Sequence, residues 1–186
     1  MNGIVLTHGA GSNADSPLLV ALDQAFQEAG WRVVRYNLPY RQARPKGPPF
    51  PAQAAADRAG LAGEVARMRA AVDGIVAVGG HSYGGRQASM LAAEQPGLID
   101  RLLLLAYPLR PPRKPEQLRT AHFPDWRTPA LFVHGTRDPF ATIEELKTAT
   151  AIIPAPVRIH AIERAGHELK GLDVRVIVAE FLQGLE

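Results

Sequence analysis

The sequence of 186 residues contains no cysteine, so disulfides, thiolate metal sites and a cysteine nucleophile are all excluded. It also lacks a long apolar run, since the longest, from Leu102 to Leu109, falls far short of the roughly 18 residues that a membrane span requires. No signal peptide is expected, because the first apolar stretch, at residues 4–6, has no basic region before it and runs into a glycine turn. These absences predict a cytoplasmic protein with no membrane partner.

What the sequence does contain fits one ordinary domain spanning residues 1–186. Hydrophobic residues make up 46% and charged residues 21%, a balance that excludes a disordered protein and supplies enough apolar surface for a core. The formal net charge is +3, with 17 Arg against 4 Lys, and there are 16 prolines. No basic stripe follows a helical pattern and no aromatic ladder accompanies one, so nucleic acid is not an expected partner.

Short apolar runs alternate with longer helical patterns along the chain. The predicted strands lie at 3–7, 31–36, 74–78, 101–106, 130–134 and 157–162, and the predicted helices at 16–28, 52–72, 83–94, 143–151 and 172–185. Thr142 with Glu145 predicts a capping box at one helix start, and Gly30 predicts a left-handed turn after another helix. Several runs are apolar at consecutive positions, which is typical of strands covered on both faces. The pattern therefore predicts an α/β fold, a three-layer αβα sandwich around a mostly parallel six-stranded sheet.

Two proline-rich segments, 37–51 and 107–129, each follow a predicted strand and together hold eleven of the sixteen prolines. Ligands of open parallel sheets bind at the carboxyl ends of the strands, so both segments are expected at the mouth of a site. The second segment is too short for a cap domain and leaves room only for a turn or two of helix at 115–120. An open site without a lid is therefore predicted.

The arginines concentrate around these two segments and predict a basic rim at the mouth. Arg41, Arg110 and Tyr107 are the residues expected to contact a substrate there. A basic rim steers anionic substrates, and a guanidinium grips a carboxylate or phosphate in a forked pair. The alternative is that these arginines are solvated and incidental to function.

One predicted strand–helix junction carries the pattern Gly-x-Ser-x-Gly, in Gly80-His81-Ser82-Tyr83-Gly84. A nucleophile elbow of this kind forces the serine into a strained turn with its hydroxyl exposed, and glycines two positions away on either side avoid collisions with it. The stretch does not fit a phosphate-binding loop, because Gly84 is followed by Gly85 and Arg86. A helix–sheet contact that merely needs small residues is the other explanation. Ser82 is the candidate nucleophile.

A serine nucleophile needs a base and an acid that orients the base, in the chain order serine, acid, histidine for sheets with this elbow. Asp138 stands in a turn after the fifth predicted strand and is the expected acid, with Glu163 and Asp125 as alternatives. His167 lies in the loop after the last predicted strand, where the base must come close to the serine. The sequence thus predicts a triad of Ser82, Asp138 and His167.

An oxyanion hole needs two backbone donors, one from the residue after the nucleophile and one from the loop after a neighbouring strand. The first donor is the amide of Tyr83, and the candidate for the second is the amide of Ala10 in the glycine-rich loop after the first strand. Gly9 and Gly11 are expected to let this loop approach the substrate, and His8 to brace it through a hydrogen bond. A simple tight turn is the alternative for this loop.

Across nearly its whole length the chain resembles the α/β-hydrolase superfamily. The motifs that carry the resemblance are His8-Gly9-Ala10-Gly11, Gly80-His81-Ser82-Tyr83-Gly84, Gly135-Thr136-Arg137-Asp138 and Gly166-His167. More narrowly, the chain is similar to the small, capless dienelactone-hydrolase-like branch, grouped with testis-expressed and NSL-complex-subunit hydrolase-like proteins. The resemblance implies a minimal hydrolase core that lacks the first two strands of the full fold and a cap domain. Dienelactone hydrolases themselves use a cysteine nucleophile, which this chain lacks, so their substrate is not carried over.

These observations predict a serine hydrolase that cleaves a carboxylic ester or thioester through an acyl-enzyme, with a preference for substrates that bear a negative group. The expected partner is a small-molecule substrate, with neither a metal nor an organic cofactor, and a homodimer is left open. Two other functions stay open from sequence. One is a catalytically silent interaction module, as in relatives that act within complexes, and the other is acyl transfer or C–C bond cleavage by the same triad.

Overall fold

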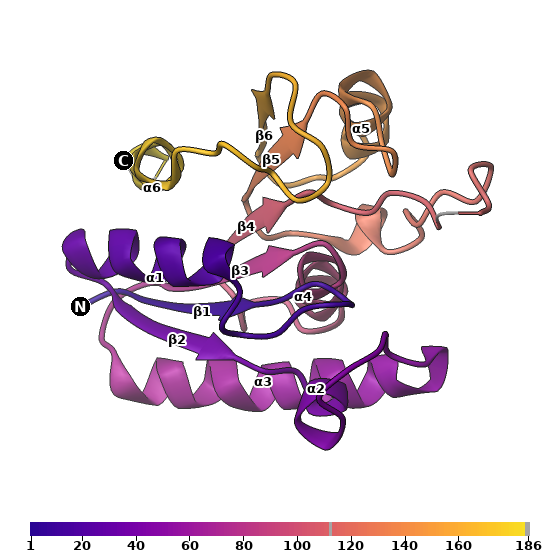
Figure 1. Ribbon diagram of the computed structural model, residues 1–186. Coiled ribbons are helices and arrows are strands. Elements are labelled where there is room, and N and C mark those ends of the chain that lie inside the picture. The colour runs from indigo at the N-terminus through magenta and orange to yellow at the C-terminus, as the bar shows by residue number, and fades with distance from the viewer. Residues whose placement is uncertain (112, 185–186) are drawn as a thin grey trace.

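The computed structural model describes residues 1–111 and 113–184, which form one parallel sheet flanked by helices (Figure 1). The strands are β1 Gly3–Thr7, β2 Arg32–Tyr36, β3 Val76–His81, β4 Arg101–Leu105, β5 Ala130–Gly135 and β6 Val157–Ile162. The α-helices are α1 Pro17–Glu28, α2 Pro39–Ala43, α3 Ala54–Ala71, α4 Tyr83–Glu94, α5 Ile143–Thr150 and α6 Val174–Gln183, and two 3₁₀ turns are η1 Pro51–Gln53 and η2 Phe123–Asp125. Two sequence predictions extend beyond the described residues: the loop 107–129 at residue 112 and the last helix at residue 185.

The six strands are hydrogen-bonded in the order β2-β1-β3-β4-β5-β6, and every neighbouring pair is parallel. The arrowheads of β1 to β4 accordingly point to the same side of the sheet in Figure 1. The predicted α/β sandwich is therefore confirmed, and the sheet is wholly rather than mostly parallel. Because all carboxyl ends share one edge, the loops after β1, β3, β5 and β6 meet there.

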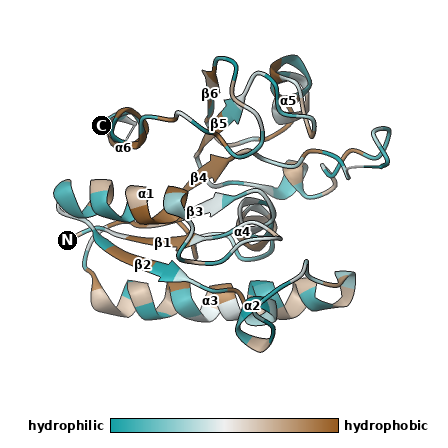
Figure 2. Ribbon diagram, viewed as in Figure 1, coloured by the Kyte–Doolittle hydropathy of each residue, from teal (hydrophilic) through white to brown (hydrophobic). Residues whose placement is uncertain are grey.

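Alternate side chains of the strands supply two separate apolar clusters, one on each face of the sheet. Ile4 packs in the cluster with α1 and α6, whereas its neighbour Val5 packs in the cluster with α3, α4 and α5. Figure 1 shows α1 and α3 on opposite sides of the sheet, and Figure 2 shows β1 and β4 as largely hydrophobic. This double coverage explains why the strands read as continuous apolar runs in the sequence.

Several local signals have the expected structure. Thr142 accepts a hydrogen bond from the amide of Glu145, whose carboxylate accepts from the amide of Thr142, so the capping box is formed. Gly30, with φ of 80°, follows α1 as expected. The predicted turn of helix at 115–120 is wrong, since the short helix of that segment is η2, and α2 was not predicted at all.

The short helix α2 has a tertiary cause that the sequence alone does not display. Pro39 stands at its start, which suits the first turn of a helix, but five residues are too few to be stable alone. The amide of Tyr40 in its first turn donates to the carboxylate of Asp57, a fully buried residue of α3 (2.9 Å). A partner seventeen residues away therefore supplies the cap.

Within the described ranges no helix is long and apolar enough to cross a membrane.

Candidate active site

Ser82 occupies a strained turn between β3 and α4. Its backbone has φ of 50° and ψ of −115°, a left-handed conformation that a residue with a side chain rarely adopts. The Ser82 amide donates to the carbonyl of Leu105 at the end of β4 (2.8 Å), which ties the turn to the sheet. The strain is thus held in place by the surrounding structure and presents the hydroxyl at the edge of the sheet.

The glycines of the elbow are required by close backbone contacts. A β-carbon on Gly80 would lie 2.3 Å from the amide nitrogen of Gly85, and one on Gly84 would lie 2.6 Å from the carbonyl oxygen of His8. Each distance is far below van der Waals contact. The pattern therefore reflects packing of α4 against β3 and against the loop after β1, rather than a clash with the serine itself.

Three side chains predicted from the sequence form one hydrogen-bonded chain. The Ser82 hydroxyl lies 2.7 Å from Nε2 of His167, and Nδ1 of His167 lies 2.8 Å from Oδ2 of Asp138. Ser82 and His167 are partly exposed, whereas the side chain of Asp138 is fully buried. The order of atoms is the one that lets a carboxylate orient an imidazole and lets the imidazole accept the proton of a hydroxyl.

The turn after β5 fixes the carboxylate of Asp138. Its second oxygen, Oδ1, accepts a hydrogen bond from the amide of Phe140 (2.8 Å), while the buried His134 donates from Nε2 to the carbonyl of Ala141 (2.8 Å). The ring of Phe140 then packs against the imidazole of His167, with ring centroids 4.3 Å apart. One turn therefore holds both the acid and the ring that it orients.

His81, immediately before the serine, holds the loop that carries His167. Its Nε2 lies 3.0 Å from the carbonyl oxygen of His167 and donates to it. Burial lowers the pKa of His81, which favours the neutral ring with a single N–H. The elbow thus fixes the histidine loop through the backbone as well as through the serine.

Two backbone amides beside Ser82 have no acceptor within the described part of the chain. They belong to Ala10 and to Tyr83, and both residues line the same pocket as Ser82. The amide of Gly84 donates to the carbonyl of His8 (3.1 Å), which joins the loop after β1 to the first turn of α4. A negative oxygen that develops near the serine would meet these two free donors.

Three carbonyls of the loop after β1 accept hydrogen bonds from side chains of α2. The Tyr40 hydroxyl lies 3.0 Å from the carbonyl of Gly9 and 2.9 Å from that of Ala10. The guanidinium of Arg41 donates to the carbonyls of Ala10 (3.0 Å) and Ser12 (2.7 Å). These contacts hold the backbone on either side of the Ala10 amide, which has no acceptor within the described residues.

His8 braces this loop as expected. Its Nε2 accepts from the amide of Leu38 (3.1 Å), and its Nδ1 donates to the carbonyl of Gly9 (2.9 Å). Burial lowers the pKa of His8, in keeping with a neutral ring that both donates and accepts. Asp57 completes the support, since it accepts from the hydroxyl of Tyr83 (2.6 Å) as well as from α2.

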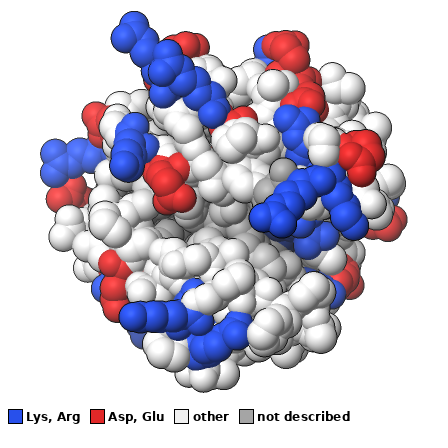
Figure 3. All heavy atoms as spheres, turned by 45° about the vertical axis from the view of Figure 1, so that its right-hand side comes forward, with Lys and Arg blue, Asp and Glu red and all other residues white. Residues whose placement is uncertain are grey.

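A pocket of about 1120 Å³ opens over Ser82 at the carboxyl edge of the sheet. Gly9, Ala10 and Gly11 form part of the lining, together with residues 48–51 of the first proline-rich segment. Figure 3 shows the hollow on the face that the strands point toward, with Lys and Arg side chains gathered beside it. Both proline-rich segments contribute to the mouth, the second through Pro108 and Arg119, so the expectation about their position is confirmed.

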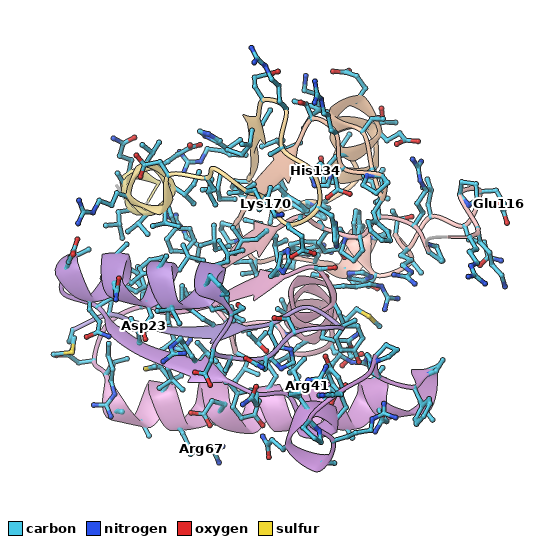
Figure 4. All side chains as sticks on the ribbon, in the orientation of Figure 1. Asp23, Arg41, Arg67, Glu116, His134 and Lys170 are labelled. Carbon is cyan, nitrogen blue, oxygen red and sulfur yellow. The ribbon has the colours of Figure 1, made fainter. Side chains whose placement is uncertain are left out.

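Three residues expected to contact a substrate do not line this pocket. Tyr107 is fully buried, and its hydroxyl pairs with Ser89 (2.8 Å), because the chain turns inward directly after β4. Arg41 is 6% exposed and serves the backbone behind the loop after β1 (it is labelled in Figure 4, beside α2). Arg110 forms an ion pair with Glu145 at the start of α5. Each of these side chains is engaged with the protein instead.

Three pocket residues on helices and in the turn after β5 were not predicted from the sequence. They are Arg58 on α3, Arg86 on α4 and Phe140, whereas Arg119, which also lines the pocket, comes from the second proline-rich segment, where a basic rim was expected. Arg86 stands four residues after Ser82, one helical turn on, so its spacing from the elbow was the available signal. Within the described residues, no three His, Asp or Glu side chains are grouped to hold a metal ion.

Comparison with known proteins identifies this architecture. A family model described as an alpha/beta hydrolase domain matches residues 1–175. The structure is similar to Est1E from Butyrivibrio proteoclasticus, solved with ferulic acid bound, at 15% identity with a TM-score of 0.76, over 98% of this chain and 90% of that one. It is also similar to an alpha-beta serine hydrolase homologue from Coxiella burnetii (19% identity, TM-score 0.75, 100% and 85% covered). A dienelactone hydrolase from Anabaena variabilis matches at 23% identity (TM-score 0.72, 98% and 84% covered).

Proposed function

The chain belongs to the α/β-hydrolase domain family, and from that premise we propose that it is a serine hydrolase that cleaves a carboxylic ester or thioester through an acyl-enzyme. Ser82 is the nucleophile, His167 the general base and acid, and Asp138 the group that orients the imidazole. The amides of Ala10 and Tyr83 form the oxyanion hole. The narrower assignment to the capless dienelactone-hydrolase-like branch stays a prediction, because a neighbour at 23% identity shows only a common fold.

The first half of the reaction forms the acyl-enzyme. The Ser82 oxygen attacks the carbonyl carbon as its proton passes to Nε2 of His167, and the carbonyl oxygen becomes an anion held by the two amides. When the tetrahedral intermediate collapses, the bond to the alcohol or thiol breaks, and the leaving group takes the proton from His167. Oδ2 of Asp138 accepts from Nδ1 of His167 and stabilises the imidazolium that forms.

The second half repeats these steps with water as the nucleophile. Water loses its proton to His167 as it attacks the acyl carbon, and the second intermediate releases a carboxylic acid while the proton returns to the Ser82 oxygen. The open pocket over Ser82 gives water access to the acyl carbon.

One observation carries the proposal more than any other. A continuous path leads from the strained Ser82 through His167 to the buried Asp138, with separations of 2.7 and 2.8 Å, and at its serine end two amides have no other acceptor among the described residues. A protein that only presented this fold as a binding surface would need neither the strain at Ser82 nor the unpaired amides. The arrangement therefore supports catalysis rather than a silent module.

The test is hydrolysis of a panel of 4-nitrophenyl and thioester substrates of varied acyl length. We expect Ser82→Ala to lower kcat/KM by roughly 10⁴-fold, because the remaining residues stabilise the transition state without a nucleophile. Ser16→Ala, which removes the N-cap of α1, is the matched serine control and should keep most of the activity. Equal activity in Ser82→Ala and the unmodified protein would overturn the proposal.

A further inference from the structure

The wall of the pocket formed by α4 contains buried donors that have no acceptor. Among the described residues, five buried side-chain nitrogens lack a hydrogen-bond partner, and two of them are Nε of Arg86 and Nε2 of Gln87. These residues are adjacent in α4, and both line the pocket. Gln87 is fully buried, and its carbonyl oxygen already accepts from Arg58 (2.9 Å). Buried donors without acceptors are costly, so two of them at one place indicate a ligand that supplies acceptors.

A second cation faces the same space. Arg119 lines the pocket, and its amide is held by the carbonyl of Leu109 (2.7 Å), which fixes the backbone at the mouth. Burial lowers the pKa of Arg119, and the neighbouring charge of Arg86 lowers it further. No carboxylate contributes to that shift, and neither arginine takes part in the arginine ion pairs found in the described ranges. Two like charges held together without a counterion are relieved by a bound anion.

Arg58 shows what a neutralised arginine in this pocket looks like. It lines the pocket as well, yet it pairs with the carboxylate of Glu94 (2.9 Å) and donates to Gln87. Glu94 lies outside the pocket lining, and the one acidic residue among the described lining residues is Glu168, an exposed residue next to His167. Within the described residues, one of the three arginines therefore has a carboxylate partner and two have none.

The neighbouring His122 responds to this positive potential. Burial, with smaller contributions from Arg86 and Arg58, lowers the pKa of His122 to about 4. The ring is therefore uncharged near neutral pH, and its Nε2 is engaged with Ser89 (2.9 Å). His122 neither neutralises the two arginines nor competes with them for an anion.

We propose that Arg86, Gln87 and Arg119 form a subsite for an anionic group of the substrate, a carboxylate or a group of similar shape and charge, beside Ser82. The inference rests on the proposed function, since it assigns a substrate class to the same pocket. It replaces the arginines expected from the sequence, Arg41 and Arg110, which are both occupied within the protein. A guanidinium and an amide together supply the forked and single donors that a carboxylate accepts.

Arg86 lies close to the nucleophile along α4. Its amide donates to the carbonyl of Ser82 (3.0 Å), so the two residues lie one helical turn apart, a rise of about 5 Å. Both residues line the same pocket, so one substrate can place a carbonyl carbon at the Ser82 hydroxyl and an anionic group at the guanidinium of Arg86. The subsite therefore suits esters whose acid or alcohol part carries a carboxylate.

Two pairs of matched substrates distinguish these sources of the anion. The acid-side pair is the 4-nitrophenyl monoester of adipic acid and the same ester with its free carboxylate replaced by an amide. The alcohol-side pair is 4-acetoxybenzoate and 4-acetoxybenzamide. We expect kcat/KM to be at least about tenfold higher for the anion in one pair, and this preference to fall as salt is added.

Variants locate the preference within the pocket. The anion-to-amide ratio is kcat/KM for the anionic ester divided by kcat/KM for its amide counterpart. Arg86→Gln and Arg119→Gln should each reduce this ratio by about tenfold or more, and Arg86→Lys should restore part of it. Arg113→Gln is the matched control, because Arg113 is exposed on the same segment as Arg119 and lies outside the pocket lining. Thermal unfolding of each variant shows that it is folded.

Binding of the products tests the subsite without relying on turnover. Adipate and 4-hydroxybenzoate are titrated calorimetrically into the protein, with their amides as references and with the same variants. Tighter binding of one acid, lost in Arg86→Gln and Arg119→Gln but kept in Arg113→Gln, supports the subsite. Equal binding and equal hydrolysis of acid and amide overturn it. If the unmodified protein hydrolysed none of the esters but still bound one acid more tightly than its amide, the proposed function would be overturned and the subsite would not.

Discussion

Polar side chains on two sides of the pocket differ in whether the protein supplies their hydrogen-bond partners. Behind the loop after β1, Arg41 donates to four backbone carbonyls, and the Tyr40 hydroxyl lies within hydrogen-bond distance of one of these, that of Ala10, and of the carbonyl of Gly9, so those side chains are satisfied within the protein. On the other wall Arg86 and Gln87 carry buried nitrogens with no partner within the described residues. The same residue type, arginine, is thus structural on one wall and available to a ligand on the other.

Whether an arginine near the pocket supports the fold or binds a ligand therefore depends on its hydrogen-bond partners rather than on its position. A guanidinium whose donors all meet carbonyls contributes stability and shape, because removing it leaves several acceptors unsatisfied. A guanidinium with buried, unmet donors costs stability until a ligand arrives. The comparison predicts different outcomes when each kind of arginine is replaced.

The largest effect is expected where the contacts are complete. Arg41→Gln should lower the free energy of unfolding by about 2 to 4 kcal/mol, because carbonyls of the loop after β1 lose their donors. It should also lower kcat on charged and neutral esters alike, since the loop that carries the Ala10 amide loosens. Chemical denaturation and steady-state kinetics measure both quantities.

The control for Arg41 is Arg32→Gln, which removes an exposed arginine from β2 and should change the stability by no more than about 0.5 kcal/mol. If Arg41→Gln changed the selectivity between anionic and neutral esters while leaving stability intact, Arg41 would be a substrate ligand. The distinction between the two walls would then fail.

An intermediate effect tests the environment of His122 beside α4, where burial and, to a smaller extent, the charges of Arg86 and Arg58 lower its pKa. Because the folded pKa of His122 is about 4, below the ordinary 6.5, the unfolded state binds its proton first as the pH falls. The stability contributed by neutral His122 is present above pH 6.5 and is lost between about pH 6.5 and 4. His122→Asn should therefore flatten the fall of stability in this range by about 1 to 2 kcal/mol.

Thermal unfolding as a function of pH measures this effect. His8 and His81 have pKa values lowered by burial and remain in the variant, so the slope should decrease rather than vanish. An unchanged slope would show that His122 titrates normally, so that neither burial nor the charges of Arg86 and Arg58 lower its pKa.

The smallest effect is expected outside both walls. Arg110 pairs with Glu145 at the surface, and such pairs contribute about 1 kcal/mol or less. Arg110→Gln should therefore alter the melting temperature slightly and leave the anion-to-amide ratio at its original value. A clear decrease of that ratio, measured with the same paired esters, would indicate that Arg110 contacts the anionic group of the substrate.

The sequence carried most of the information on the fold and on the central side chains. Strand and helix positions follow from the spacing of apolar residues and from local caps such as Thr142, which act within a few residues. Ser82, Asp138 and His167 were traceable because each follows a strand and the carboxyl ends of parallel strands meet at one edge. The structure places their polar atoms within hydrogen-bond distance of one another.

The rest depends on contacts that sequence spacing does not encode. Tyr107 turned inward and Arg41 turned to the backbone because of partners that only the folded chain supplies. The short helix α2 forms against Asp57 of α3, and the unpaired state of Arg86 appears only once every neighbouring acid has been placed. Basic loops in the sequence indicated charge near the mouth but could not show which guanidinium lacks a partner.

The most direct test of the central claim is covalent labelling of the folded protein with a fluorophosphonate, followed by peptide mass spectrometry. We expect one adduct per chain, located on Ser82, that fails to form in Ser82→Ala and forms far more slowly in His167→Ala. Prior labelling should also abolish ester hydrolysis. Full hydrolysis by protein that carries no adduct, or an adduct confined to another serine, would show that Ser82 is not the nucleophile.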